Sequence, residues 1–411
     1  MRTFAQVIDS LSPGARVFVA GCGGEPSGFA NALAADPSRA PGLVFTGAPI
    51  PGVNTIDWSA LSAGGLFETI LLSPALREGF AAGRVRFLPL HYTALARRLG
   101  ARGHVDVAVV RVAPAEGDTF SLGLTTDFAP LVIDAGARLI GEVDRTLPAP
   151  RGAPTLPRAR FDALVETDRP APLYDPGEVP DAIAKAGQRV ADLVPEGASL
   201  QFGLSKVQVA VLEALQGRKG LSYHGGMISD ALEPLVEDGA FKGPLTTGVA
   251  IGSARHGAWV AERDDILFRP VTITHGTASL AGVERMTAIN SVLAVDLFGQ
   301  AVADMVDGRQ VSGHGGLLDF VRGTQVSPGG RSILALAASA KGGTISRIVP
   351  CLDGAAVTVP RGDQDIVVTE HGAAHVKDLD IDERAEALIS IAAPSHRDRL
   401  TEAWRQMRAR M

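Results

Sequence analysis

Residues 16–26 read Arg16-Val17-Phe18-Val19-Ala20-Gly21-Cys22-Gly23-Gly24-Glu25-Pro26. A short apolar run that ends in a glycine-rich turn is typical of a buried parallel strand that leads into a helix. The same kind of run returns, with helical stretches between, at residues 42–46, 86–90, 105–110 and 137–143. The first half of the chain is therefore predicted to form an α/β domain around a mainly parallel sheet.

A proline-rich stretch, residues 147–180, interrupts this alternation and reads as an interdomain connection. The alternation then resumes with helices at 180–193 and 206–216 and with strands at 199–202, near 245–251, 291–297, 332–338, 355–359 and 365–369. The sequence thus predicts an α/β protein of two related, open, mainly parallel-sheet domains. Their predicted bounds are 1–175 for the N-terminal domain and 176–411 for the C-terminal domain.

The composition is that of a globular protein. The 411 residues are 46% hydrophobic and 20% charged, which is enough to bury a large core. The sequence shows no run of about 18 uncharged apolar residues and no signal-peptide pattern, so we expect a cytoplasmic protein without a membrane span. Cys22 and Cys351 are expected to be small buried thiols. The formal net charge of −6 argues against nucleic acid as a partner.

Ligands of open α/β sheets bind at the carboxyl ends of the strands, so the glycine-rich turns are the candidate sites. Residues 21–26 offer backbone N–H groups to an anion, but lack the acidic residue of a dinucleotide site. Residues 203–207 and 223–227 resemble the nucleophile and oxyanion sequences of serine hydrolases in the reverse order, which excludes that class. His371 and His375 lack the glutamate of a zinc-protease helix, so no metal site is predicted.

Two further turns favour an anionic ligand. Residues 312–316 read Ser-Gly-His-Gly-Gly, and their glycines allow a ligand to approach the backbone closely. Shortly after, Lys341, Gly342 and Arg347 combine cations with a flexible backbone, which suits a phosphate or pyrophosphate.

Ordered motifs extend over nearly the whole chain. In the C-terminal half they are Ala288-Ile289-Asn290-Ser291, Val295-Asp296-Leu297-Phe298-Gly299-Gln300, Ser312-Gly313-His314-Gly315-Gly316, Asp319-Phe320-Val321-Arg322-Gly323, Lys341-Gly342-Gly343, Ser346-Arg347-Ile348-Val349-Pro350 and Arg384-Ala385-Glu386-Ala387-Leu388-Ile389. Upstream they are Gly23-Gly24-Glu25-Pro26, Pro89-Leu90-His91, Ser121-Leu122-Gly123 and His275. On these residues the chain resembles the acetyl-CoA hydrolase / 4-hydroxybutyrate CoA-transferase family.

The resemblance implies two CoA-transferase-type α/β domains and an assembly that is a homodimer or a hetero-oligomer with a related subunit. It implies coenzyme A as substrate and no metal, with an acyl-CoA and a small carboxylate acceptor as partners. In that family a glutamate attacks the acyl-CoA carbonyl and becomes a glutamyl–CoA thioester, which splits one difficult exchange into two easier steps. The residues that the resemblance implies for coenzyme A binding are Gly313, Gly315, Gly316, Lys341, Gly342 and Arg347.

One position departs from the family motif at the nucleophile. The family reads His-Ser/Thr-Glu-Met, whereas this chain reads His224-Gly225-Gly226-Met227. Gly226 stands where the glutamate is expected, and a glycine has no side chain that could attack a thioester. The family loop also usually has an apolar residue at the position of His314.

Three hypotheses follow. In the first, the chain is a CoA-transferase-like or acetyl-CoA hydrolase-like enzyme of altered chemistry, in which His224 or His314 activates water. In the second, the nucleophile is a different carboxylate, with Glu25, Asp230 and Glu370 as candidates. In the third, the chain is a catalytically inactive homologue or subunit that binds coenzyme A or regulates a partner.

Overall fold

The computed structural model describes residues 2–411, which divide into two compact units. The first unit contains the chain up to Asp175 with Gly226–Asp230 and Pro244–Thr274, and the second contains Pro176–Gly225, Ala231–Gly243 and His275–Met411. Met1, the first residue of the predicted N-terminal domain, lies outside the described residues.

Two segments predicted in the C-terminal domain, residues 226–230 and 244–274, group with the first unit instead. Long-range backbone contacts explain the difference, because the Thr126 N–H donates to the Gly248 carbonyl at 2.9 Å and Thr125 forms a bridge with Val249. The division into two domains with bounds 1–175 and 176–411 stays a prediction.

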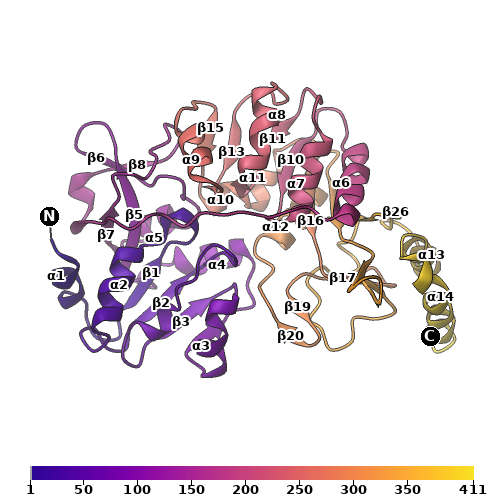
Figure 1. Cartoon of the computed structure of the whole chain (residues 1–411), viewed down its shortest axis with the longest axis horizontal. Helices are drawn as coiled ribbons and strands as arrows, with labels where there is room; N and C mark the ends of the chain where they lie inside the picture. The colour runs from indigo at the N-terminus through magenta and orange to yellow at the C-terminus, as the bar shows by residue number, and fades with distance from the viewer. Residues whose placement is uncertain (1) are drawn as a thin grey trace. The chain divides into compact units, whose positions relative to one another are not determined.

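The main sheet of the first unit is built around the strand of residues 16–19. Its strands are β1 (Arg16–Val19), β2 (Val44–Gly47), β3 (Leu66–Thr69), β4 (Val85–Phe87), β5 (Val107–Pro114), β6 (Thr119–Ser121), β7 (Arg138–Val143), β8 (Thr155–Pro157) and β9 (Ala163–Glu166). The row β4-β3-β2-β1-β5-β7-β9 is parallel throughout, and β6 and β8 continue antiparallel from β5 (Figure 1). The strand order reverses between β1 and β5, so the turn after β1 leaves the sheet at the position where such folds bind ligands.

The remaining elements of the first unit are helices and short strands, several of which lie in the segments 226–230 and 244–274. They are α1 (Phe4–Asp9), η1 (Cys22–Gly24), α2 (Ser27–Ala35), η2 (Trp58–Ala60), η3 (Pro74–Leu76), α3 (Arg77–Ala81), α4 (Tyr92–Leu99), α5 (Ala129–Asp134), η4 (Arg158–Arg160), β12 (Met227–Ile228), β13 (Leu245–Thr247), β14 (Val249–Ala250), α9 (Ala254–Ala261), β15 (Ile266–Phe268) and α10 (Val271–Thr274).

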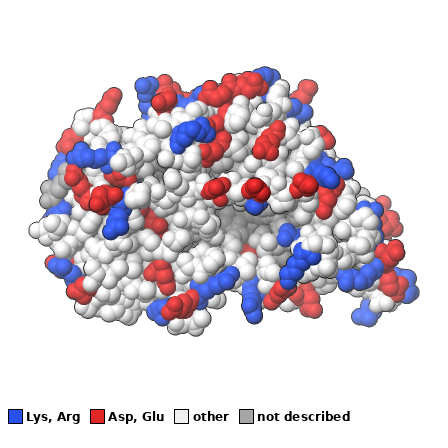
Figure 2. Space-filling model, in the orientation of Figure 1, with Lys and Arg blue, Asp and Glu red and all other residues white. Residues whose placement is uncertain are grey.

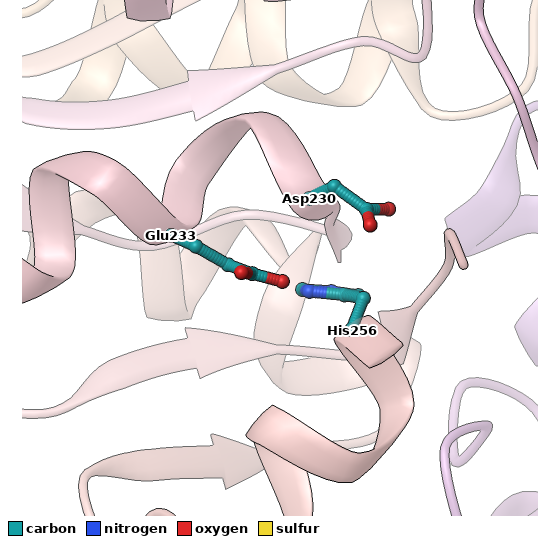
Figure 3. Close-up of side chains that lie close together, drawn as sticks. All are labelled: Asp230, Glu233 and His256. Carbon is teal, nitrogen blue, oxygen red and sulfur yellow. The ribbon is translucent and has the colours of Figure 1, made fainter. Parts of the chain in front are cut away.

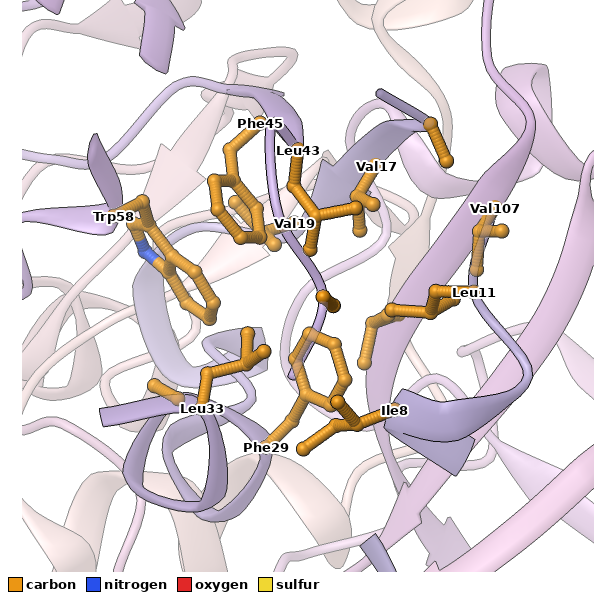
Figure 4. Close-up of a cluster of buried hydrophobic side chains, with 14 of the residues drawn as sticks. Ile8, Leu11, Val17, Val19, Phe29, Leu33, Leu43, Phe45, Trp58 and Val107 are labelled. Carbon is orange, nitrogen blue, oxygen red and sulfur yellow. The ribbon is translucent and has the colours of Figure 1, made fainter. Parts of the chain in front are cut away.

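The core of the first unit lies between the sheet and the helices α1 and α2 (Figure 4). Phe29 and Leu33 are four residues apart on α2, so both face the sheet, and both are fully buried. The Trp58 ring lies 6.4 Å from that of Phe29 and 5.3 Å from that of Phe45. This packing holds α2, and with it the turn of residues 21–26, against the sheet.

The second unit contains another mainly parallel sheet, in the order β11-β10-β16-β21-β25-β26, of which only the β25–β26 pair is antiparallel. Its strands are β10 (Ser199–Phe202), β11 (Ser222–Tyr223), β16 (Met286–Ser291), β17 (Ala294–Asp296), β18 (Ala301–Val302), β19 (Met305–Val306), β20 (Arg309–Gln310), β21 (Arg331–Ala335), β22 (Ser339–Ala340), β23 (Ile345–Ser346), β24 (Ile348–Val349), β25 (Ile366–Thr369) and β26 (Gly372–His375). Its helices are α6 (Asp181–Leu193), α7 (Lys206–Ala214), α8 (Glu233–Glu237), α11 (Thr277–Ala281), α12 (Leu317–Val326), α13 (Ile381–Ser390) and α14 (Pro394–Arg408), and η5 (Asp230–Leu232) precedes α8. The predicted fold class is confirmed.

Several local predictions were wrong. Residues 355–359 form no strand and contribute a single bridge between Val359 and Ala301. The stretch 147–180 is not only a connection, because β9 within it pairs with β7 along the sheet. Cys22 is buried as expected, whereas Cys351 is exposed.

The charged side chains show no large region of one sign on the visible face, where Lys and Arg alternate with Asp and Glu (Figure 2). This pattern agrees with the small formal net charge. Within residues 2–411, none of the helices combines the length and apolar character that crossing a bilayer requires.

Candidate active site

The turn after β1 in the first unit is closed by a side chain from outside the predicted motif. The Asn54 Oδ1 accepts the Cys22 N–H at 2.9 Å, and its Nδ2 donates to the Cys22 carbonyl at 3.1 Å. These bonds hold Cys22 at a φ of 49°. Gly21 must be a glycine here, since a Cβ would lie 2.5 Å from the Ala48 carbonyl oxygen.

Glu25, a predicted catalytic residue, is 3% exposed beside this turn. Burial raises the pKa of its carboxyl to about 7, although hydrogen bonds from Asn54 and Trp58 and the charge of Arg111 act in the opposite direction. Because the protonated form is a poor nucleophile and the group is hidden from solvent, this environment argues against Glu25 as the attacking carboxylate.

The buried guanidinium of Arg111 fixes the backbone that follows the turn. Its Nε donates to the Glu25 carbonyl at 3.1 Å, and its Nη2 donates to the Ser27 hydroxyl at 2.5 Å. Its charge is balanced by Glu142 at 3.3 Å and Asp144 at 2.8 Å. No sequence pattern predicted this network, because Arg111 lies on β5, Glu142 and Asp144 lie at the end of β7 and directly after it, and Ser27 begins α2.

Gly226 lies in the first unit and is tied to the same region by backbone contacts. Its carbonyl accepts the N–H groups of Gly248 and Val249, both at 3.1 Å. Thr125, which bridges to Val249, also lies against the turn after β1, since a Cβ on Gly24 would approach the Thr125 Cβ to 3.1 Å. The first unit therefore connects Gly226 to the 21–26 turn through Val249 and Thr125.

In the second unit, His275 lies against the glycine turn of residues 312–316 and interacts electrostatically with His224. His224 follows β11, where its N–H donates to the Leu200 carbonyl at 3.0 Å. His275 is buried, and its burial, with a smaller effect from the charge of His224, lowers its pKa to about 3. A Cβ on Gly316 would lie 2.3 Å from the His275 Nε2, so only glycine fits against this imidazole. His275 is therefore neutral at physiological pH.

His314 has a buried carboxylate beside it. Its Nδ1 lies 3.6 Å from the Oδ2 of Asp304, and their side chains are 16% and 7% exposed. Although burial acts to raise the pKa of Asp304, hydrogen bonds from His314, Gln310 and Thr358 lower it below the usual value. The result is an ionised carboxylate beside the imidazole of His314, which belongs to the glycine turn predicted as a candidate site.

Comparison with known proteins decides the family. A succinyl-CoA:cyclohexane-1-carboxylate CoA transferase from Geobacter metallireducens is 32% identical over 406 residues, which cover 93% of this chain and 90% of that protein. The chain belongs to the acetyl-CoA hydrolase/transferase family. Residues 252–404 match the acetyl-CoA hydrolase/transferase C-terminal domain.

Other members of the family match along almost their full length. A 4-hydroxybutyrate coenzyme A transferase from Clostridium kluyveri is 29% identical over 98% of this chain and 97% of that protein. The crystal structure of RipA from Yersinia pestis superposes with a TM-score of 0.90 at 28% identity, over 99% of this chain and 97% of that chain. The family resemblance stated from the motifs is thus confirmed, and the named relatives make this a family of acyl-CoA enzymes.

The residues predicted to bind coenzyme A fall on two loops of the second unit. Gly313, Gly315 and Gly316 immediately precede α12. Lys341 and Gly342 form the exposed tip of the β22–β23 hairpin, with φ angles of 48° and 65°, and Arg347 lies between β23 and β24. The hairpin tip is held by α14, because the His396 Nε2 lies 2.8 Å from the Gly343 carbonyl oxygen. The role of these residues in binding stays a prediction.

The two remaining candidate carboxylates are engaged in local structure. Asp230 accepts the Ser253 N–H at 3.0 Å and the Ser253 hydroxyl, and Ser253 in turn caps α9. Glu370 accepts the Ala338 N–H at 2.8 Å. Figure 3 draws Asp230 with His256 of α9 and with Glu233, the first residue of α8. All three are of types that bind metals, so the absence of a metal stays a prediction.

Proposed function

We propose that this chain is an acyl-CoA thioester enzyme for a small acyl group, in which a water activated by a histidine takes the place of the family's nucleophilic glutamate. Family membership supports the acyl-CoA substrate. The observation that carries the altered chemistry is the pair formed by His314 of the 312–316 turn and Asp304, which precedes β19. An imidazole beside an ionised carboxylate is the usual arrangement of a general base.

The other candidates for a nucleophile have less support. Gly226 offers no side chain. Glu25 is buried, with its pKa raised to about 7. Asp230 and Glu370 accept backbone hydrogen bonds that stabilise a helix terminus and a turn. Removing either carboxylate from that bond would leave a partly buried donor without its partner, which costs about 1 kcal/mol or more.

The proposed reaction is a hydrolysis. The neutral His314 takes a proton from water, and the water oxygen forms a bond to the thioester carbonyl carbon. The tetrahedral intermediate then collapses, the C–S bond breaks, and the thiolate of coenzyme A leaves and takes the proton from the imidazolium. Backbone N–H groups of the 312–316 turn are suited to stabilise the oxyanion, and each well-placed donor contributes about 3 kcal/mol.

The test is turnover of purified protein with acetyl-CoA, butyryl-CoA and succinyl-CoA. Free thiol measures hydrolysis, and chromatography of new acyl-CoA species in the presence of acetate or succinate measures transfer. We expect thiol release in water alone. His314→Gln is expected to lower turnover at least about tenfold, or about 1.4 kcal/mol of barrier, and His224→Ala tests the second histidine. The exposed His375 on β26 provides a matched control, because His375→Gln should leave the rate unchanged.

A second candidate function is favoured by Gly226 itself. A family member without the nucleophile is suited to bind coenzyme A without turnover, alone or as a subunit beside an active relative. Calorimetric binding of coenzyme A without thiol release or new acyl-CoA would select this alternative. Gly226→Glu is the complementary probe, since a borohydride-sensitive glutamyl–CoA thioester in this variant would support the alignment of Gly226 with the family nucleophile.

A further inference from the structure

Asp304 is the centre of the loop that leads to His314. It follows β18 and is 5% exposed. Its carbonyl accepts the N–H groups of Val311 at 2.9 Å and Ser312 at 3.3 Å. The residue thus anchors the backbone of the strand pair β19–β20 and the first residues of the glycine turn.

The carboxylate of Asp304 is held on both of its oxygens. Its Oδ1 accepts the Thr358 hydroxyl at 3.0 Å, and its Oδ2 accepts the Gln310 Nε2 at 2.7 Å. The same Gln310 Nε2 donates to the Ser312 carbonyl at 2.8 Å, which joins the carboxylate to the turn. With these contacts fixed, Oδ2 is also the oxygen that faces the His314 Nδ1 at 3.6 Å.

We propose that Asp304 is a positioning residue that orients His314 and selects the tautomer with its proton on Nδ1. This inference rests on the proposed function, because it concerns the base of that reaction. An acceptor carboxylate beside Nδ1 stabilises the Nδ1–H tautomer, which leaves Nε2 with a lone pair. It also stabilises the imidazolium that forms when Nε2 takes the proton from water, and Asp304 stays ionised throughout.

Thr358 and Gln310 have a supporting role in this arrangement. A carboxylate on a mobile loop would rotate, and the nearby imidazole would lose its orientation. Since both oxygens are bonded and the group is buried, the position of the charge is set before substrate binds. Preorganised charge of this kind acts more strongly in a buried site than in water.

The first test is a double-mutant cycle on turnover with Asp304→Asn, His314→Gln and the combined variant. If Asp304 acts through His314, Asp304→Asn lowers kcat at least about tenfold with little change in KM, and it adds nothing in the His314→Gln background. Asp307→Asn is the matched control, because it makes the same substitution at an exposed aspartate of the same loop. An effect of Asp304→Asn that persists in full without His314, or that Asp307→Asn reproduces in full, would overturn the inference in favour of a purely structural role.

The second test does not depend on the folding of the Asp304 variant. The ¹⁵N shifts of the histidine ring nitrogens report the tautomer, and His314→Gln assigns the signal that belongs to His314. We expect a protonated Nδ1 and an unprotonated Nε2 in the neutral form of the wild-type protein, and the opposite tautomer would refute the proposal. The wild-type protein separates the two questions: absence of any turnover argues against the proposed function, whereas the tautomer is read without substrate.

Discussion

Glu25→Gln is expected to make the protein more stable than wild type at high pH but not at low pH. Burial raises the pKa of the Glu25 carboxyl to about 7, against an ordinary value of 4.5, even though Asn54, Trp58 and Arg111 oppose this shift. The folded state therefore binds this proton more tightly than the unfolded chain does. The resulting stabilisation is fully present below a pH of about 4.5 and is lost as the pH rises through about 7.

The size of the effect follows from the two pKa values. Their difference is 7 − 4.5 = 2.5 units, and each unit corresponds to about 1.4 kcal/mol, so wild type loses about 3 kcal/mol between pH 4 and pH 8. Glutamine is neutral at every pH and keeps an oxygen that accepts a hydrogen bond from Asn54 or Trp58. The free energy of unfolding of the Glu25→Gln variant therefore lacks this decrease with rising pH.

Urea unfolding between pH 4 and pH 8, followed by tryptophan fluorescence, measures the effect, since Trp58 packs in the core of the same unit. We expect the free energy of unfolding of Glu25→Gln minus that of wild type to grow with pH by about 3 kcal/mol over the full window. Glu116 is exposed in the first unit, so Glu116→Gln is the matched control for the same substitution outside the buried turn. Parallel curves for Glu25→Gln and wild type would refute the raised pKa and with it the argument against Glu25 as nucleophile.

Three further predictions concern buried contacts within each unit. Burial lowers the pKa of His275 to about 3. The stability that the neutral ring contributes is therefore fully present above a pH of about 6.5 and is lost as the pH falls. His275→Gln should remove this loss and so reduce the dependence of the unfolding free energy on pH by about 1.4 kcal/mol per pH unit between pH 6 and pH 4. Gly316→Ala should destabilise the protein by about 1–3 kcal/mol, because the new Cβ overlaps the His275 ring. Gly362→Ala is the control, because a Cβ at Gly362 meets nothing within 4 Å. Equal decreases in melting temperature for Gly362→Ala and Gly316→Ala would contradict this explanation. Arg111→Met leaves two buried carboxylates without their cation and should cost about 3–5 kcal/mol in denaturant unfolding. The exposed pair of Arg145 is the comparison, since Arg145→Met should cost less than about 1 kcal/mol.

The parallel sheets were predictable because strands buried on both faces need nearly continuous apolar residues. The strand β5 shows this clearly, since all its residues except Pro114 are buried. The strand β3 was missed because Glu68 interrupts its apolar run. Residues 355–359 have the composition of a strand but form only one bridge at Val359, which shows that pairing partners, and not composition alone, decide whether a strand forms.

The candidate site was predictable only in part. The glycines and His314 were proposed from residue types, because glycines let a ligand approach the backbone closely and an imidazole can take up a proton near neutral pH. Their role in the site stays a prediction. Asp304 and Asn54 were missed, since an isolated aspartate or asparagine in a loop gives no sequence signal. Asn54 reaches back 32 positions to Cys22, and Thr358 reaches Asp304 across 54 positions.

By itself, the sequence determined the α/β class, the two sheets, the glycine turns that follow β1 and β10, and the family. These properties depend on local periodicity and on ordered motifs, which are written along the chain. Only the tertiary structure decided that Gly226 groups with the first unit, that Asp304 lies beside His314 and that Gly316 must admit the ring of His275. Such contacts join residues that are distant in sequence. The burial that they create sets the pKa values of Glu25 and His275, and no local sequence pattern encodes this burial.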